Sequence, residues 1–440
     1  MRISVIGTGY LGAVHAAGMA ELGFDVVGVD VDQAKIDSLA QAKMPFYEPH
    51  FEPMLERHVG NRLTFTTDFA AVADADVHFV CVGTPQQRGS LAADMTYVDA
   101  AVDAIIPHLK DGALVVGKST VPVGTAERLA ERIENLTPDS VKAELAWNPE
   151  FLREGLAVQD TLHPDRLVLG VSSEHSEQIL RRVYERTITQ DGTPVVVTDL
   201  PTAELVKVAA NSFLATKISF INAMSEICEI TGADVTKLAD AIGYDERIGR
   251  KFLNAGVGFG GGCLPKDIRA LQTRVGELGL DHTMRFLDEM DQINLRRRDK
   301  VVTLAEQILD ADLAGKRIAV LGVAFKPLSD DVRDSPGLDV AVRLFSSGAD
   351  VAVYDPESNK NAAKRFPRLG YVDSLTEAVT GADLVVLTTE WNEFKALTPS
   401  DLEGLVAKKQ LIDARNVLSA EEWEGAGWRF AQLGRYFNDA

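Results

Sequence analysis

The sequence RISVIGTGYLGAVHAAGMAELGFDVVGVD, residues 2–30, decides the fold class. A short apolar strand comes first, followed by the glycine pattern GxGxxG that begins at Gly7. A helix of small and apolar residues follows, and then a second apolar strand that ends in Asp30. This order of elements predicts one βαβ unit of a doubly wound, mostly parallel sheet.

The three glycines of the pattern have different physical roles. Gly7 permits a tight turn, Gly9 lets the backbone approach a pyrophosphate, and Gly12 lets the helix pack against the strand. The helix N-terminus offers unpaired N–H groups and a positive dipole end to phosphates. Asp30 can accept hydrogen bonds from ribose hydroxyls and would repel a 2′-phosphate, so NAD is favoured over NADP. A glycine turn without a ligand is the alternative, but it would not require the strand, helix and acidic residue together.

Alternating elements continue along the first part of the chain. Further strands are predicted at residues 76–82, 113–116, 145–147, 167–170 and 195–197. Thr84 and Thr120 follow two of these strands, at the carboxyl ends where a doubly wound sheet binds ligands. On spacing alone, each threonine is an equally good candidate for a turn or a helix cap.

After residue 198 the pattern changes twice. Residues 203–230 contain no Gly or Pro and predict a long helix, and apolar spacing predicts another between residues 284 and 308. The chain then repeats its opening, because residues 316–322, 349–355 and 382–387 mirror the early strands. The turn at residues 322–327, GVAFKP, lacks the GxGxxG spacing and adds a lysine, which indicates a phosphate-bearing ligand other than NAD.

We therefore expect an α/β protein with two Rossmann-like doubly wound domains joined by a central helical segment with long helices. The predicted domains are an NAD-binding domain at 1–198, a helical domain at 199–310 that carries a cysteine loop, and a C-terminal Rossmann-like domain at 311–440.

Composition excludes several functional classes. The 440 residues carry 45 Lys and Arg against 65 Asp and Glu, a net charge of −20, which argues against a nucleic-acid or membrane-binding surface. No apolar run approaches the ~18 residues of a membrane span, and glycines interrupt the N-terminal apolar run, unlike a signal peptide. Three cysteines without metal-ligand spacing indicate a cytoplasmic protein with neither a disulfide framework nor a metal site.

The most specific segment is GVGFGGGCLPKD, residues 256–267. Five glycines among seven residues predict a loop whose backbone can approach a ligand closely. Cys263 ends this loop near a lysine and at a predicted helix start, which would lower its pKa and favour the thiolate. A small apolar cysteine in a structural turn is the alternative, and core positions are expected for Cys81 and Cys228.

Two further groups of polar residues are candidates for chemistry. Glu204, Lys207 and Asn211 share one face of an otherwise apolar helix, so Lys207 needs a partner or an anionic ligand. The alternative is a Glu204–Lys207 pair on a solvated edge. In NPEFLREG, Glu150 and Glu154 follow a predicted strand and could orient a water or bind ribose, or could be an exposed charge pair.

Together these motifs resemble the UDP-glucose/GDP-mannose dehydrogenase family over nearly the whole chain. The resemblance rests on GTGYLG with Asp30, CVGTP, STVPVGT, NPEFLREG, the Glu204–Lys207–Asn211 helix, GFGGGCLPKD, GVAFKP with DDVRDSP, and IDARN. It implies a four-electron oxidation of the C6 alcohol of UDP-glucose to a carboxylate, consuming two NAD and one water. It also implies that the helical middle forms a homodimer or a higher oligomer.

The resemblance implies roles for individual residues. Cys263 matches the nucleophile, and Lys207, Asn211 and Asp267 match groups around the reacting oxygen. Thr120 and Glu150 resemble the pair that handles water. The implied cofactor contacts are Gly7, Gly9, Tyr10, Leu11, Gly12, Asp30, Lys35, Thr84, Thr120, Glu154, Lys266 and Arg333. The implied substrate contacts are Glu150, Phe151, Leu152, Arg153, Lys207, Asn211, Phe252, Leu253, Asn254, Gly256, Gly260, Phe325, Lys326 and Arg415, with Arg247 reaching the substrate across a dimer.

Charge and chemistry leave defined alternatives. An anionic substrate on a chain of net charge −20 requires a local basic cluster, for which the candidates are Lys207, Lys251, Lys266, Lys326, Arg333 and Arg415. GDP-mannose or another nucleotide sugar is the nearest rival substrate. A two-electron hydroxyacid dehydrogenase would not need Cys263, and a non-catalytic nucleotide binder would not need Lys207, Asp267 and Cys263 together.

Overall fold

The computed structural model describes residues 1–280 and 282–437. The chain divides into two compact units. Unit 1 comprises Met1–Ala210 with Arg269–Gly279, and unit 2 comprises Asn211–Ile268 with Leu280–Ala440. Two helices, α9 and α11, contribute residues to both units.

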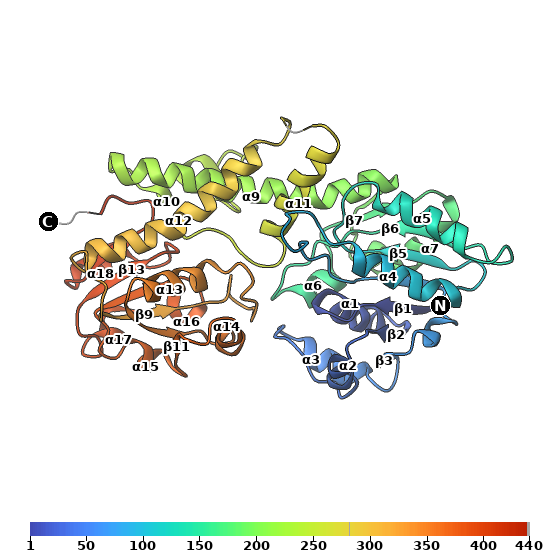
Figure 1. Ribbon diagram of the computed structural model, residues 1–440, viewed down its shortest axis with the longest axis horizontal. Helices are drawn as coiled ribbons and strands as arrows, with labels where there is room; N and C mark the ends of the chain where they lie inside the picture. The colour runs from blue at the N-terminus through green and yellow to red at the C-terminus, as the bar shows by residue number, and fades with distance from the viewer. Residues whose placement is uncertain (281, 438–440) are drawn as a thin grey trace. The chain divides into compact units, whose positions relative to one another are not determined.

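Unit 1 is built on an eight-stranded sheet with the order β3-β2-β1-β4-β5-β6-β7-β8 (Figure 1). Its strands are β1 (Arg2–Ile6), β2 (Asp25–Val29), β3 (Leu63–Thr66), β4 (Val77–Val80), β5 (Leu114–Gly117), β6 (Glu144–Trp147), β7 (Leu167–Gly170) and β8 (Val195–Thr198). Neighbouring strands are parallel except for β6 and β7, which pair antiparallel. The order of the first six strands is that of a doubly wound dinucleotide-binding sheet.

Helices cover both faces of this sheet, with one hydrophobic core on each side. They are α1 (Tyr10–Glu21), α2 (Gln33–Ala40), α3 (Phe51–His58), η1 (Phe69–Val72), α4 (Thr96–Ile105), η2 (Ile106–His108), α5 (Thr125–Leu136), α6 (Ala157–Leu162), α7 (Glu174–Val183) and α8 (Glu185–Gln190). The inner strands are apolar because both of their faces are buried, whereas Val196 and Val197 of the edge strand β8 are exposed.

The opening βαβ unit forms as the sequence predicts. Gly7 has a φ of 87°, in the region that glycine adopts at little cost, and its N–H donates to the carbonyl of Val29 at 2.7 Å. A Cβ at Gly12 would come within 3 Å of the Gly7 carbonyl, so a glycine is required where α1 packs on this turn. No side chain caps the N-terminus of α1, which leaves its first amides available to an anion.

Unit 2 contains a six-stranded parallel sheet with the order β11-β10-β9-β12-β13-β14 (Figure 1). The strands are β9 (Arg317–Leu321), β10 (Asp350–Tyr354), β11 (Gly370–Tyr371), β12 (Leu384–Leu387), β13 (Gln410–Asp413) and β14 (Arg429–Gln432). The arrangement repeats that of β1 to β6, and Gly322 repeats the bond of Gly7 by donating to the carbonyl of Tyr354 at 2.8 Å. The predicted internal repeat is therefore confirmed.

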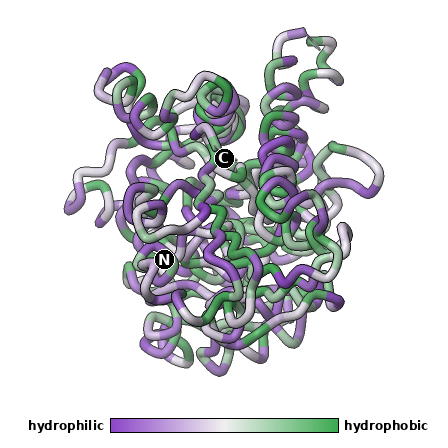
Figure 2. Tube along the Cα trace, turned by 90° about the vertical axis from the view of Figure 1, so that its left-hand side faces the viewer, coloured by the Kyte–Doolittle hydropathy of each residue, from purple (hydrophilic) through white to green (hydrophobic). Residues whose placement is uncertain are grey.

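The chain between β8 and β9 is mainly helical. Its helices are α9 (Leu200–Thr231), α10 (Val235–Gly243), α11 (Leu264–Glu277) and α12 (Phe286–Ile308). The C-terminal sheet carries α13 (Pro336–Ser346), α14 (Asn359–Arg365), α15 (Leu375–Val379), α16 (Asn392–Lys395), α17 (Pro399–Leu402) and α18 (Ala420–Gly425). Hydrophobic and hydrophilic residues interleave along the helices, as expected for helices with one buried face (Figure 2).

The predicted fold class is confirmed: two Rossmann-like sheets and a helical segment with long helices. The helices of the described chain include none with both the length and the apolar character of a membrane span.

Candidate active site

Unit 1 contains a cavity of about 600 Å³ beside the glycine pattern. Gly7, Gly9, Asp30 and Lys35 line it, as predicted for a cofactor site. The sequence analysis did not identify its apolar wall, which is formed by Phe69, Tyr97, Ala100, Ala101 and Ala104. The first backbone N–H groups of α1 have no side-chain cap and suit a phosphate. Asp30 suits ribose hydroxyls and the apolar wall suits a flat base, so the cavity fits a dinucleotide.

Asp30 is held in a defined orientation at the edge of this cavity. One carboxylate oxygen accepts the Thr8 N–H and the Lys35 ammonium, both at 2.8 Å, and the other accepts the Asp32 N–H at 3.0 Å. Burial opposes ionisation, but these bonds outweigh it and hold the pKa of Asp30 below its usual value. The acid is therefore ionised at neutral pH, as recognition of ribose hydroxyls requires.

Three residues predicted to contact the cofactor, Tyr10, Thr84 and Thr120, do not line this cavity. The Tyr10 hydroxyl donates to Glu48, and the Gly155 N–H reaches both groups. Glu48 is buried and also accepts the Ala157 N–H at 2.7 Å. Tyr10 thus connects the glycine turn to Gly155, the last residue of NPEFLREG. The Thr84 hydroxyl donates to the carbonyl of Thr120 at 2.8 Å.

Glu150 and Lys207 form a nearly buried ion pair in unit 1. The Lys207 ammonium lies 3.2 Å from one carboxylate oxygen of Glu150, and the other oxygen accepts the Leu152 N–H at 2.6 Å. The Phe151 ring packs between two cations, with its centroid 3.8 Å from the guanidinium carbon of Arg166 and 5.5 Å from the Lys207 ammonium. The alternative of an exposed charge pair at Glu150 is thereby excluded.

Glu204 is buried, but it does not pair with Lys207 on a solvated edge. Its two carboxylate oxygens accept the N–H groups of Gly124 at 2.8 Å and Ala126 at 2.7 Å, at the start of α5. Burial outweighs these bonds and raises the pKa of Glu204 to about 7. The shared face of Glu204, Lys207 and Asn211 is confirmed as buried, but Glu204 serves as a helix cap.

Cys263 lies at the end of the glycine loop in unit 2, directly before α11, as predicted. Its side chain is exposed, whereas Cys81 and Cys228 are buried core residues. Burial raises the pKa of the Cys81 thiol to about 12. Of the three thiols, Cys263 is thus the exposed one.

The glycine loop is clamped from several sides. A Cβ on any of its five glycines would approach a neighbouring atom within 3 Å, at Gly262 the guanidinium of Arg333. The Gly256 N–H donates to Asn222 at 2.9 Å, and the Gly261 N–H donates to the carbonyl of Arg333 at 2.8 Å. The glycines are required for close packing as well as for turns.

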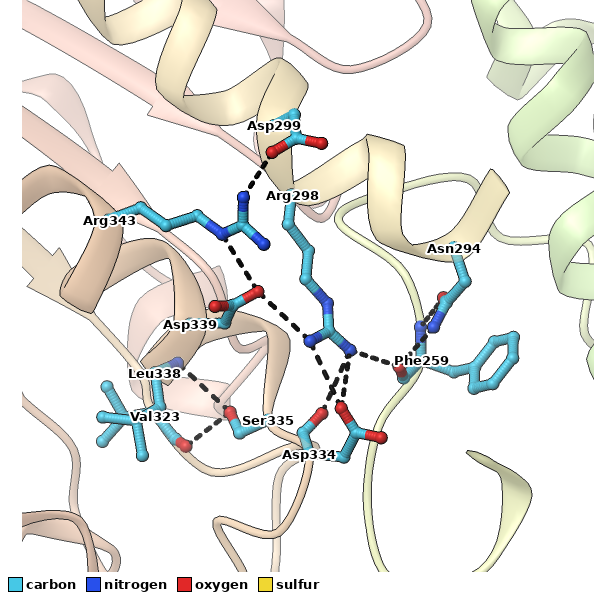
Figure 3. Close-up of polar contacts among 10 residues, drawn as sticks. All are labelled: Phe259, Asn294, Arg298, Asp299, Val323, Asp334, Ser335, Leu338, Asp339 and Arg343. Carbon is cyan, nitrogen blue, oxygen red and sulfur yellow. Dashed lines mark hydrogen bonds and ion pairs between the residues drawn. The ribbon is translucent and has the colours of Figure 1, made fainter. Parts of the chain in front are cut away.

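Two residues of α12 complete the clamp (Figure 3). The Asn294 side chain accepts the Phe259 N–H and donates to the Phe259 carbonyl. Arg298 is buried and donates to the Phe259 carbonyl at 3.4 Å, to the Asp334 carbonyl and carboxylate at 3.2 Å, and to Asp339 at 3.2 Å. Arg298 therefore fixes the loop before Cys263 relative to the segment that carries Arg333.

Asp267 lies one turn into α11 and is almost completely buried. One carboxylate oxygen accepts the side-chain N–H of Asn211, and the other accepts the Lys266 ammonium, both at 2.6 Å. Lys266, predicted as a cofactor contact, thus contacts the predicted catalytic acid. Asn211 follows Lys207 by one turn of α9.

A second cavity, of about 430 Å³, lies within unit 2. The predicted substrate contacts Phe252, Asn254, Gly260, Phe325, Lys326 and Arg415 line it. Lys251 supplies a third cation to this cavity. Glu390, which the sequence analysis did not identify, supplies a carboxylate. Three cations around one cavity suit a diphosphate, so part of the expected basic cluster is present here.

Arg415 is preorganised in this cavity. Its guanidinium donates to the carbonyls of Thr388 at 2.8 Å and Gly258 at 2.9 Å, and it lies 3.2 Å from Glu390. Asp413, buried at the end of β13, accepts the Arg415 N–H at 2.9 Å. Burial raises the pKa of Asp413 despite these bonds.

Other predicted contacts do not line either cavity. Leu253 and Gly256 are buried in packing, and Arg247 is exposed and pairs with Asp245 at 2.6 Å. Arg153 pairs with Asp160 at 2.6 Å, and Arg333 pairs with Asp331 at 2.7 Å. Leu11, Glu154 and Thr120 also lie outside the cavity that carries Gly7. Within the described residues, no cluster of three or more His, Cys, Asp or Glu could hold a metal ion.

Comparison with known proteins identifies the family. Three models of the UDP-glucose/GDP-mannose dehydrogenase family match the chain: the NAD binding domain at residues 1–188, the central domain at 201–296 and the UDP binding domain at 319–420. Proteins named UDP-glucose 6-dehydrogenase from Rickettsia bellii and Rhizobium meliloti are each 42% identical, over 99% of this chain and 99% and 100% of theirs.

Solved structures agree with the sequence relatives. A UDP-glucose dehydrogenase from Pyrobaculum islandicum is similar with a TM-score of 0.90 and 36% identity, covering 99% of this chain and 98% of its own. A UDP-D-ManNAc dehydrogenase from Pyrococcus horikoshii has a TM-score of 0.85 and 28% identity, covering 99% of both chains. The chain therefore belongs to the UDP-glucose/GDP-mannose dehydrogenase family.

Proposed function

We propose that this NAD-dependent dehydrogenase oxidises UDP-glucose at C6 to UDP-glucuronate. The observation that carries the proposal is Cys263, an exposed thiol directly before α11 on a loop that is clamped at Phe259, Gly256 and Gly261. The relatives named UDP-glucose 6-dehydrogenase, which match over almost their full length, support the substrate. The cation-lined cavity of unit 2 supports a diphosphate group.

The proposed reaction removes four electrons from one carbon. The first oxidation converts the C6 alcohol to an aldehyde, and the Cys263 thiolate adds to the aldehyde carbon to give a thiohemiacetal. Its second oxidation gives a thioester, which water hydrolyses, so that the C–S bond breaks and the thiolate is restored. NAD, which Gly7, Gly9 and Asp30 would hold, would supply the hydride acceptor for both oxidations. One UDP-glucose, two NAD⁺ and one water give UDP-glucuronate, two NADH and three protons.

Five polar residues are assigned to the reacting oxygen, its protons and the attacking water. Lys207 supplies a cation and Asn211 a donor to the oxyanion of the tetrahedral species, and losing such a donor typically costs ~3–4 kcal/mol of barrier. Asp267, hydrogen-bonded to Asn211 and Lys266, orients Asn211, and the alcohol proton passes either to Lys207 or to a water held by Asp267. Glu150, with Thr120, handles the water that attacks the thioester.

Nucleotide binding is divided between two parts of the chain. We assign the dinucleotide to the cavity of unit 1, where Gly7, Gly9 and Asp30 would hold the pyrophosphate and ribose. We assign the UDP group to the cavity of unit 2, where Lys326, Lys251 and Arg415 would hold the diphosphate. The functional division remains an NAD-binding domain at 1–198, a central domain at 199–310 and a UDP-sugar domain at 311–440.

The proposed oligomer is a homodimer formed through α9. Phe213, Phe220, Ile227 and Ile230 are exposed on this helix with spacings of seven, seven and three residues. Such a stripe lies along one side of a helix, as in helix pairs that pack along their length. We place Arg247, which is exposed and just beyond α10, near the substrate of the partner subunit. A reduced exposed thiol is consistent with a cytoplasmic location.

Product analysis tests the proposed function. Incubation with NAD and UDP-glucose should yield UDP-glucuronate with two NADH for each sugar, whereas GDP-mannose should turn over much more slowly. Faster turnover of GDP-mannose would reassign the substrate. One NADH per sugar with accumulating aldehyde would contradict the thioester route.

A further inference from the structure

Lys118 is a buried cation of unit 1 for which the proposed mechanism has so far assigned no role. It directly follows β5 and lies two residues before Thr120. Its ammonium donates to the side-chain oxygen of Asn148 at 2.9 Å and to the Asn148 carbonyl at 3.3 Å, and lies 3.5 Å from the Tyr184 hydroxyl. A buried ammonium is retained only where such contacts compensate for lost hydration.

The partners of Lys118 connect two functional loops. Asn148 follows β6 and precedes Glu150 by two residues, and its N–H donates to the Gly117 carbonyl at 2.8 Å. The side-chain oxygen of Asn148 also accepts the Tyr184 hydroxyl at 2.6 Å, and its side-chain amide donates to the Val168 carbonyl at 2.9 Å. Lys118 and Asn148 therefore fix the loop of Thr120 against the loop of Glu150.

Lys118 and Glu150 also share a polar cavity of about 50 Å³. His15 and Thr161 line it, and within the described residues the His15 Nε2 and Thr161 Oγ1 atoms have no protein hydrogen-bond partner. A polar cavity of this size suits ordered water. The cavity beside Glu150 is therefore lined in part by charged and polar side chains.

The electrostatic surroundings of Lys118 are well defined. The Phe79 ring centroid lies 5.7 Å and the Tyr184 ring centroid 6.0 Å from the ammonium. Burial lowers the pKa of Lys118 to about 8, and the neighbouring Cys81 and Glu150 act in the opposite direction.

We propose that Lys118, together with Asn148 and Tyr184, is a positioning residue that holds Glu150 for hydrolysis of the thioester. This inference rests on the proposed function. In the step concerned, the water oxygen bonds to the thioester carbon, the C–S bond breaks, the sulfur leaves as thiolate, and a water proton passes to Glu150. Hydride transfer does not use this proton, so loss of Lys118 should slow hydrolysis selectively.

The test separates the two stages in Lys118→Met, which keeps the side-chain length and removes the charge. Rapid mixing with NAD and UDP-glucose should give two NADH per active site at a rate within threefold of the unaltered protein. Steady-state turnover should then be at least tenfold slower, and intact-mass analysis of quenched samples should show the sugar nucleotide attached to Cys263. Lys110→Met, at an exposed lysine paired with Asp76, is the matched control and should behave as the unaltered protein.

Other outcomes are decisive as well. Unchanged steady-state turnover, or equal slowing of both stages without an adduct, would overturn the role of Lys118. If Lys118→Met does not fold, Tyr184→Phe, which removes one donor to Asn148, should show the same selective slowing to a smaller extent. Failure of the proposed function is a separate result, because the unaltered protein itself would then not form two NADH per sugar.

Discussion

Asn294 satisfies both backbone polar groups of Phe259, accepting its N–H at 2.7 Å and donating to its carbonyl at 3.0 Å (Figure 3). Asn294 is fully buried on α12. Its side-chain amide makes the two backbone hydrogen bonds that a neighbouring strand would otherwise supply to the loop before Cys263. A glycine-rich loop has high conformational entropy when free. Its order therefore depends on such contacts.

Asn294→Ala should consequently loosen the cysteine loop. It leaves the N–H and the carbonyl of Phe259 without their partner, at a cost of about 1–3 kcal/mol for each buried group. We expect kcat to fall at least tenfold, and labelling of Cys263 by a thiol reagent to change in rate. Gln292→Ala, at an exposed amide on the same helix, is the control for both assays. Normal kcat in folded Asn294→Ala would contradict the clamp.

Cys263→Ala tests the covalent route directly. Without the sulfur, neither the thiohemiacetal nor the thioester forms, so production of NADH from UDP-glucose should stop after the first oxidation. Binding of UDP-glucose should be largely retained, because the cavity that carries Lys326 and Arg415 is unaltered. Calorimetry and steady-state assays measure the two effects. Cys228→Ala, at a buried core thiol, is the matched control; four-electron turnover in Cys263→Ala would refute the mechanism.

Much of this architecture could be predicted from the sequence because its signals are local. Gly7 and Gly12 each meet a steric demand of one turn, and apolar runs such as residues 77–80 are typical of strands buried on both faces. Cys263 stood out because charged residues and five glycines surround it. For these residues, the neighbouring positions in the sequence are enough to indicate the local structure.

The supporting residues could not be predicted in the same way. Asn294, Asn148 and Lys118 find their partners 35, 30 and 30 residues away, respectively, so no spacing in the sequence reveals them. Tyr97 and Ala101 line the cofactor cavity from α4, but an apolar helix face looks the same whether it contacts a core or a ligand. Glu204 was placed on the correct face, but its partners at the start of α5 lie 78 and 80 residues away.

The exposed stripe of α9 predicts a specific effect on assembly. A double substitution, Phe213→Glu with Phe220→Glu, places two charges on this stripe and should convert the proposed dimer to a monomer, because an unpaired carboxylate is strongly disfavoured in an apolar interface. Light scattering coupled to size-exclusion chromatography gives the mass. Leu136→Glu, at an exposed apolar residue of α5, is the control and should leave the mass unchanged. A dimer that survives the double substitution would place the interface elsewhere.

Glu204 predicts a pH dependence of stability. Its pKa is raised to about 7 by burial in the folded protein, against about 4.3 for an exposed glutamate. The folded state therefore binds this proton more tightly than the unfolded state, and the resulting stabilisation is complete below the unfolded pKa. It is lost as the pH rises through about 7. Each pKa unit corresponds to about 1.4 kcal/mol, so the total change is on the order of a few kcal/mol.

Glu204→Gln removes this titration and keeps the shape of the side chain. Glutamine stays neutral at every pH, and its NH₂ group cannot accept the second N–H at the start of α5. The stability of the unaltered protein relative to the variant should therefore be greatest near pH 5 and decline toward pH 8. Thermal unfolding midpoints across this range measure the difference, with Glu134→Gln, at an exposed carboxyl of α5, as control. A difference that does not vary with pH would show that Glu204 does not bind a proton near neutral pH.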